Sequence, residues 1–349
     1  MDMLTFNADN GYLEAVVRGL KASLLRRNDY TNLAQCENLE DVRTILNSTD
    51  YAPWLQNEPA PLQTQALFDC LTERLVHDYR SVRSQAYAPL STFLDYITYP
   101  YMIDNLVLLL MGVLRNRDLG EVLDKCHPLG LFEGMATLAV VTSPEELYRE
   151  ILVDTPLAPY FAECVSVHDL TEMNVEIIRN LLYKAYLADF YHLCVKRIGG
   201  TTGAVMASLI SFEADRRVIN ITLNSLDTAL RKDERVALFP RLPGGLDDEV
   251  VYRLGRADDL QAVALAMDLS GTYRALFQQA AEREDHSLED QFLEHEMKLL
   301  REAFDVQFHY GVFYAYFRMR EQEIRNLTWI GECITQKQYA HASRVVPIL

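Results

Sequence analysis

The sequence predicts an all-α protein made of three similar helical bundles. Three segments repeat the same order of features: an acidic pair, an apolar residue, a short amphipathic stretch and an aromatic stop, each followed by a long helical pattern. Such repetition indicates repeated structural units, which we expect to be related by rotation about an axis near a central cavity. Strand signals are scarce. The three segments are Leu39–Leu55, Pro144–Phe161 and Ala257–Phe277.

Each predicted unit opens with a helical pattern, over Tyr12–Leu25, Asn105–Asn116 and Asn220–Lys232. The run 218–223 is rich in β-branched residues but lies between helical patterns, so we expect helix there as well. Gly19 and Gly112 occupy matching positions in the first two opening helices. A glycine inside a helix costs about 1 kcal/mol relative to alanine, so we expect another helix to pack closely against each of them.

The acidic pairs predict the starts of three equivalent short helices, because carboxylates are favourable at the positive end of the helix dipole. The pairs are Glu40-Asp41, Glu145-Glu146 and Asp258-Asp259.

A long helix with a 3.6-residue apolar period follows in each unit. We expect the first of these to end or kink at Pro89. The predicted buried positions are Leu67, Leu71, Leu75, Tyr79, Val82 and Ala86 in unit one, Ile178, Leu181, Ala185 and Ala188 in unit two, and Leu288, Phe292, His295 and Leu299 in unit three.

The end of the chain carries an aromatic-rich stretch at 308–320 and then a segment that resembles a fourth opening helix. That last helix has an apolar face and must dock on the bundles. The predicted divisions are residues 1–100, 101–200 and 201–320 for the three units and 321–349 for the C-terminal helix. Loops are expected at 199–203, 240–245 and 282–285.

Composition limits the classes of function. The apolar fraction of 49% suits packed cores, and the net charge is −17. Such acidity argues against binding nucleic acid, whose phosphates require basic side chains. It also argues against unaided binding to an anionic membrane surface. The sequence has no run of 18 apolar residues and no basic, apolar leader, so we expect neither a transmembrane helix nor a signal peptide.

The six cysteines are expected to be reduced core residues, because most lie within apolar patterns and none forms a Cys-x-x-Cys pair. Pairing between distant cysteines stays open at this point. The segment Cys126-His127-Pro128 is interpreted as a packed turn rather than as a pair of metal ligands.

No motif predicts catalysis, a cofactor or a metal. His295-Glu296 would need a second histidine at position 299, where Leu stands. The pair Asp258-Asp259 has no third acid one helical turn later to hold a metal ion. The loop at 199–203 follows a helix rather than a strand and lacks the Gly-Lys-Ser/Thr of a phosphate loop. We therefore expect the isolated chain neither to hydrolyse ATP nor to bind it tightly.

A dense charge cluster enters the last opening helix. One interpretation is a solvated face with local ion pairs of little energetic value. The other is a junction between bundles or a contact with a partner, where arginine is enriched. Together with two residues of the C-terminal helix, the candidate partner contacts are Glu213, Asp215, Arg216, Arg217, Trp329 and Glu332.

Several long, irregular segments resemble the subunit d family of vacuolar-type proton-pumping ATPases, to which the C subunit of archaeal rotary ATPases is distantly related. The resemblance runs in collinear order from about residue 6 to residue 349. The segments are FNADNGYLEAVVRGLKA, STDYAPWL, LDYITYPYMIDNLVLLL, CHPLG, ILVDTPLAPYF, MNVEIIRNLLYKAYL, GGTT, FEADRR, FHYGVFYAYF and EQEIRNLTWI.

This resemblance implies a funnel-like helical body on the cytoplasmic face of vacuolar or endosomal membranes. It implies a subunit that sits on the proteolipid c-ring, receives the foot of the central stalk made of subunits D and F, and approaches the cytosolic domain of subunit a. It implies torque transmission without catalysis, and attachment to the membrane only through protein contacts. The alternative is a generic cytosolic helical adaptor unrelated to ATPases.

Overall fold

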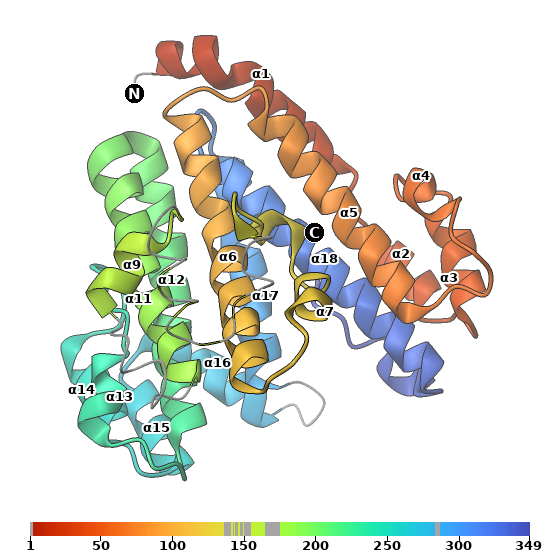
Figure 1. Ribbon diagram of the computed structural model, residues 1–349. Helices are drawn as coiled ribbons and strands as arrows, with labels where there is room; N and C mark the ends of the chain where they lie inside the picture. The colour runs from red at the N-terminus through yellow and green to blue at the C-terminus, as the bar shows by residue number, and fades with distance from the viewer. Residues whose placement is uncertain are drawn as a thin grey trace. The chain divides into compact units, whose positions relative to one another are not determined.

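The computed structural model describes residues 3–135, 141, 143, 146, 149, 155–164, 175–282 and 287–349. Every regular element in these residues is a helix, which confirms the all-α prediction (Figure 1). The chain divides into two compact units. Unit 1 comprises Met1–Ser91, Gly200–Val205 and Ala275–Leu349, and unit 2 comprises Thr92–Gly199 and Met206–Arg274.

Unit 1 is built around two long helices, α5 and α18, which pack side by side (Figure 1). The helices α1, α3 and α17 also pack on α18, so one C-terminal helix contacts most of the unit. The bounds are α1 Met3–Ala22, α2 Arg27–Leu33, α3 Leu39–Leu46, α4 Ala52–Leu55, α5 Thr64–Arg83, α17 Leu288–Asp305, α18 Gly311–Thr335 and the 3-10 turn η4 Tyr339–His341.

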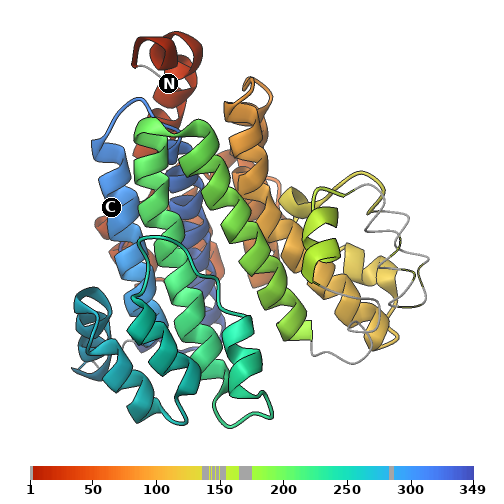
Figure 2. The same cartoon turned by 90° about the vertical axis from the view of Figure 1, so that its left-hand side faces the viewer.

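Unit 2 contains most of α6 and α12, the shorter helices between and after them, and the start of α16 (Figure 2). The bounds are α6 Leu90–Leu114, α7 Leu119–Leu123, η1 Pro128–Gly130, α9 Ala158–Cys164, α11 Val175–His192, the π-helical turn η3 Leu193–Ile198, α12 Gly200–Ser225, α13 Lys232–Ala237, α14 Asp248–Arg256, α15 Leu260–Met267 and α16 Gly271–Glu282.

Within the described residues, α6 is the one helix with the length and apolar composition to cross a membrane. In the folded chain, 61% of its apolar window is buried. Burial inside the protein therefore accounts for its composition without a membrane.

Two of the repeated short helices are alike in detail. In α3, Asn38 accepts a hydrogen bond from the backbone N–H of Asp41, and in α15, Asp259 accepts one from Ala262. These are N-caps, which satisfy a free N–H at a helix start. The caps show that the acidic pairs are not equivalent. Glu40-Asp41 lies inside the first turn of α3, whereas Asp258-Asp259 precedes α15.

The second acidic pair, Glu145-Glu146, lies largely outside the described residues. The arrangement of three rotated bundles around a cavity therefore stays a prediction, as do the divisions between them. All three predicted divisions, at 100/101, 200/201 and 320/321, fall inside continuous helices, which are α6, α12 and α18.

The predicted buried face of α5 is confirmed: its five named positions are all buried, as is Ala86 just beyond its end, and α5 ends before Pro89. The predicted face of α11 is correct only at Ile178, which is buried. Ala188 is exposed, while Tyr186 and Phe190 are buried instead. Large aromatic side chains bury more area than alanine, so they set the face of this helix. In α17, Phe292 is buried as predicted, but His295 and Leu299 are only half-buried.

The close approach predicted at Gly112 is confirmed, since a Cβ there would lie 3.0 Å from Leu119 and 3.2 Å from Val122 of α7. The same prediction is wrong for Gly19, where a Cβ would meet nothing within 4 Å.

The loop at 240–245 is confirmed. The loop at 199–203 is confined to Gly199, which has φ 68°, because α12 begins at Gly200. The loop at 282–285 lies almost entirely outside the described residues.

The packed turn at His127 is confirmed. Its ring stacks on Tyr101 at 4.1 Å between centroids, and its backbone N–H and C=O both bond to the Asn105 side chain. Burial lowers the pKa of His127 to about 4, so the ring is neutral at physiological pH.

Five cysteines are described as free and buried, as expected for core thiols: Cys36, Cys70, Cys126, Cys194 and Cys333.

Candidate functional site

The predicted charge cluster on α12 is a set of largely buried ion pairs. Arg216 Nη2 lies 2.5 Å from Glu213 Oε2, and Arg217 Nε lies 2.8 Å from Glu213 Oε1. All three side chains are no more than 21% exposed. The interpretation as a solvated face is therefore wrong.

Arg217 joins this cluster to two other helices of unit 2. Its guanidinium lies 3.4 Å from the ring centroid of Tyr183 on α11, a cation–π contact. The Tyr183 hydroxyl donates to Asp104 of α6 at 3.0 Å. Burial raises the pKa of Asp104, although Arg179 and Tyr183 oppose that rise. The cluster thus lies at a junction of α6, α11 and α12. Contact of these residues with a partner stays a prediction.

Asp215 holds a different part of unit 2. It is 8% exposed, and its carboxylate accepts hydrogen bonds from the Leu246 backbone N–H and the Tyr273 hydroxyl, both at 2.9 Å. A Cβ at position 245 would lie 2.5 Å from Asp215 Oδ1, so a larger residue there would displace this carboxylate. Asp215 therefore fastens the 240–247 loop and the start of α16 to α12. Burial raises its pKa to about 6.

A second carboxylate of unit 2, that of Asp189, also joins separate helices through hydrogen bonds. Asp189 on α11 accepts hydrogen bonds from Tyr96 of α6 at 2.8 Å and from Tyr160 of α9 at 2.9 Å. Tyr96 also stacks on Phe190 at 5.6 Å. Nothing in the sequence indicated this site, because its members are far apart in the chain.

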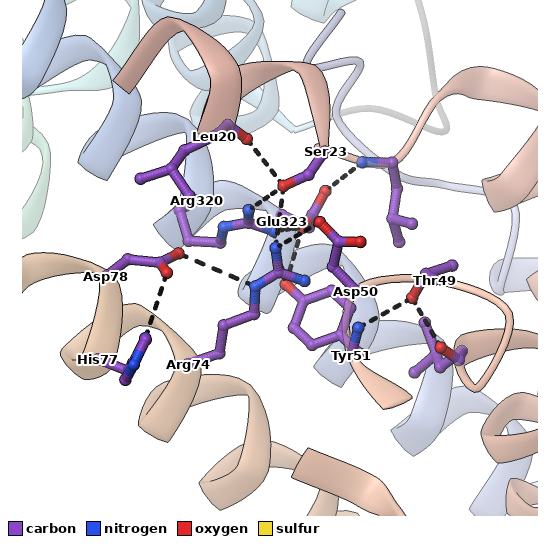
Figure 3. Close-up of polar contacts among 12 residues, drawn as sticks. Leu20, Ser23, Thr49, Asp50, Tyr51, Arg74, His77, Asp78, Arg320 and Glu323 are labelled. Carbon is purple, nitrogen blue, oxygen red and sulfur yellow. Dashed lines mark hydrogen bonds and ion pairs between the residues drawn. The ribbon is translucent and has the colours of Figure 1, made fainter. Parts of the chain in front are cut away.

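The most deeply buried charges belong to unit 1, and sequence reasoning missed them (Figure 3). Arg320 and Glu323 of α18 form an ion pair in which both side chains are 0% exposed. In the sequence they resemble an ordinary surface pair one helical turn apart. The signal that could have revealed them is the aromatic residues that surround Arg320 in the chain.

Glu323 binds two segments that lie far from α18 in the sequence. Its Oε1 accepts a hydrogen bond from the Tyr51 hydroxyl at 2.7 Å, and its Oε2 accepts one from the Leu25 backbone N–H at 2.6 Å. Tyr51 is itself 0% exposed. One carboxylate therefore fixes the chain after α1 and the chain before α4 to the C-terminal helix.

Arg320 spreads its donors over the same region. Its Nη2 donates to Ser23 Oγ and to the Tyr316 hydroxyl, both at 3.0 Å. Tyr316 in turn donates to Asp78 of α5 at 2.6 Å. Arg74 of α5 donates to Ser23 at 2.9 Å and lies over the Tyr51 ring at 4.5 Å (Figure 3).

Electrostatics keep this cluster charged. Burial alone would lower the pKa of Arg320, but Tyr51, Glu323 and Tyr316 raise it well above its usual range. Burial, reinforced by Glu323, raises the pKa of Tyr51, so its hydroxyl stays a donor. A buried charge is tolerable only when it is paired and hydrogen-bonded. The arrangement is suited to fixing four chain segments together, not to acid–base chemistry.

The other two predicted residues lie on the exposed side of α18. Trp329 is 42% exposed and donates from Nε1 to the His341 carbonyl at 3.1 Å. Glu332 is exposed. Near them, the Asn326 amide bonds to both the N–H and the C=O of Val346, which fastens the C-terminal residues to α18.

Among the described residues, no group of three His, Cys, Asp or Glu side chains could hold a metal ion. Glu296, which follows His295, accepts hydrogen bonds from Arg318 at 2.9 and 2.8 Å. It is thus part of an ion pair between α17 and α18.

Asp215 should make the stability of unit 2 depend on pH. Its folded-state pKa of about 6 exceeds the reference value of 3.8, so its contribution is complete below pH 4 and is lost as the pH rises through 6. Lowering the pH from 7.5 to 5 should stabilise the wild type relative to Asp215→Asn by on the order of 1 kcal/mol. Thermal unfolding at both pH values measures this difference. Parallel pH profiles of the two proteins would contradict it, and the exposed Asp268→Asn is the control.

Glu323→Gln should destabilise unit 1 by about 3–5 kcal/mol, because it leaves the buried Arg320 charge without its partner. Urea unfolding of the full chain measures the loss. Glu249→Gln, which breaks an exposed pair with Arg253 one turn away, should change little. Equal effects of the two substitutions would show that the buried pair has no special role.

The chain has close relatives among characterised families. A family model described as the ATP synthase (C/AC39) subunit matches residues 13–342. The V-type proton ATPase subunit d of Dictyostelium discoideum is 52% identical over 347 residues, which cover 99% of this chain and 97% of that protein. V-type proton ATPase subunit d2 of Arabidopsis thaliana is 50% identical over 337 residues, covering 97% of this chain and 95% of that protein.

Subunit d of the V-type proton ATPase of Saccharomyces cerevisiae is more distant, at 42% identity over 351 residues, with 100% of both chains covered. These matches extend over the whole folded body, including both clusters described above. The chain therefore belongs to the ATP synthase (C/AC39) subunit family, alongside the V-type proton ATPase subunit d proteins that it resembles over nearly its full length.

Proposed function

We propose that this chain is a non-catalytic coupling subunit of a V-type proton ATPase. In this role it links the central stalk, made of subunits D and F, to the membrane proteolipid ring and transmits torque during ATP-driven proton transport. The observation that carries the proposal is the 52% identity to a V-type proton ATPase subunit d over 99% of this chain. The cytosolic domain of subunit a is the further partner that we propose.

The internal bonding of the two units supports a mechanical role. A part that transmits torque must not yield when its helices are pushed past one another, and close-packed interiors resist such strain. In unit 1, the Arg320–Glu323 pair connects α18 to the segments around Ser23, Tyr51 and Asp78. In unit 2, Asp189 and Asp215 each join three separate segments. The buried polar groups are thus engaged in holding elements together.

Charge supports the proposed location. With a net charge of −17, the chain would be repelled by the anionic cytoplasmic leaflet. We therefore propose that it lies on the cytoplasmic face of vacuolar or endosomal membranes and is held there by the other subunits. The alternative function, a generic cytosolic helical adaptor, does not account for identity that extends over the full length of pump subunits.

Replacement of the native subunit tests the proposal. The chain, with an affinity tag, would be expressed in yeast cells lacking their own subunit d, and vesicles would be isolated. We expect the purified tagged chain to bring the proteolipid ring and subunits D and F with it, and ATP-dependent proton uptake to be restored. Purification of the folded chain without these subunits would favour the adaptor. The destabilised Glu323→Gln variant, tested in the same cells, should restore less proton uptake than the wild-type chain.

A further inference from the structure

Each of the three repeated segments has a buried tyrosine near its end. Near its start, a side chain accepts a hydrogen bond from the backbone N–H three residues further on. The tyrosine follows 13 to 17 residues later and is no more than 6% exposed. The accepting residues are Asn38, Ser143 and Asp259, and the tyrosines, which we call the repeat tyrosines, are Tyr51, Tyr160 and Tyr273.

Each repeat tyrosine stands at the beginning of another helix. Tyr51 is the N-cap residue of α4, and Tyr160 and Tyr273 lie in the first turns of α9 and α16. In the middle segment, the comparison depends on the hydrogen bond at Ser143 and on the residues from 155 onward, because most of the residues between them lie outside the described part of the chain. The same order of capping bond, tyrosine and helix therefore occurs in all three segments.

The hydroxyl of each repeat tyrosine donates to a carboxylate on a long helix. The O···O distances are 2.7, 2.9 and 2.9 Å, and the acceptors are Glu323 of α18, Asp189 of α11 and Asp215 of α12. Each carboxylate also accepts a hydrogen bond from a third part of the chain. These further donors are the Leu25 N–H, the Tyr96 hydroxyl and the Leu246 N–H.

Position in the chain distinguishes these bonds from another bond of the same chemistry. Tyr183, in the middle of α11, is 5% exposed and donates to the Asp104 carboxylate at 3.0 Å. It lies outside the repeated segments, and its bond joins two long helices, α11 and α6. Tyr183 therefore provides a matched comparison, since it is equally buried and makes the same kind of bond outside the repeat.

A tyrosine–carboxylate bond opposes a motion that apolar packing permits. Packed helices can slide past one another by small shear movements, because apolar contact has little directional preference. A hydrogen bond to a carboxylate is short, stronger than a neutral one and weakens steeply when its length or angle changes. Placed at the start of α4, α9 and α16, such a bond resists the sliding of each short helix along its long helix.

We propose that the three repeat tyrosines hold the short helices in place when torque passes through the chain, and that their hydroxyls thereby determine how much of that torque reaches the pump. This inference rests on the proposed function, because torque acts on the chain only within the assembled pump. The aromatic rings supply packing, and the hydroxyls supply the resistance to sliding.

Replacing tyrosine by phenylalanine separates these two contributions. The substitution removes one oxygen and retains the ring, whose neighbours are Arg74 at Tyr51, Tyr99 at Tyr160 and Phe212 at Tyr273. In the isolated full chain, each substitution should lower the thermal midpoint by about 3–6 °C, as expected for a lost hydrogen bond to a charged group. Amide exchange in α9 should become faster in Tyr160→Phe and stay unchanged in α7, because only the local opening of α9 becomes easier.

The assembled pump gives the decisive measurement. Each variant would be expressed in yeast cells lacking their own subunit d, and proton uptake and ATP hydrolysis would be measured in the same vesicles. The ratio of uptake to hydrolysis should fall in each single variant. It should fall by at least about twofold in the triple variant, because effects at separate sites combine. Tyr183→Phe should lower the thermal midpoint to a similar extent but leave this ratio at the wild-type value.

An unchanged ratio in the triple variant, or an equal fall in Tyr183→Phe, would overturn the inference and leave the proposed function standing. Unchanged exchange in α9 of Tyr160→Phe would overturn it as well, and that measurement does not require assembly. Failure of the wild-type chain to purify with pump subunits would instead overturn the proposed function, and this inference with it.

Discussion

The buried pair of Arg320 and Glu323 is the interaction on which the rest of unit 1 depends. Both side chains are 0% exposed, so neither charge can be satisfied by water. Removing such charges from water costs several kcal/mol for each ion, and only further hydrogen bonds offset that cost. Those bonds come from Ser23, Tyr51 and the Leu25 backbone, which lie 272 to 298 residues away in sequence. The requirement to satisfy two charges therefore forces the first and last parts of the chain together.

The same solution recurs in unit 2 with single carboxylates. Asp189 and Asp215 each accept hydrogen bonds from two distant segments, and tyrosine supplies a donor in both cases. A buried carboxylate specifies geometry more strictly than apolar packing, because leaving it unpaired is strongly unfavourable. Helices held in this way are suited to a part that passes force on to its neighbours. The bonding pattern and the family of the chain both support the proposed coupling role.

Local rules predicted local structure. The 3.6-residue period of α5, its end before Pro89 and the start of α3 near its acidic pair all depend on neighbouring residues, and sequence carries that information. The predicted face of α11 is correct at Ile178 but wrong at Ala188, because aromatic residues rather than alanine determine the packing of this helix. The partners of the Arg320–Glu323 pair could not be predicted, because Ser23, Leu25 and Tyr51 are distant from it in sequence. Local spacing left the cluster at Glu213 open between a solvated face and a junction or partner contact, and its burial excludes the solvated face.

Hydrogen exchange at the Leu25 backbone amide tests the central claim most directly. Leu25 lies outside any regular helix, and its N–H donates to Glu323 Oε2 at 2.6 Å. If the buried pair ties unit 1 together, this amide exchanges only when the unit unfolds, at the same rate as the core amide of Ile324 in α18. The account predicts equal protection at these two amides in the full chain. Fast exchange at Leu25 beside slow exchange at Ile324 would contradict it, because the segment after α1 would then open independently of the C-terminal helix.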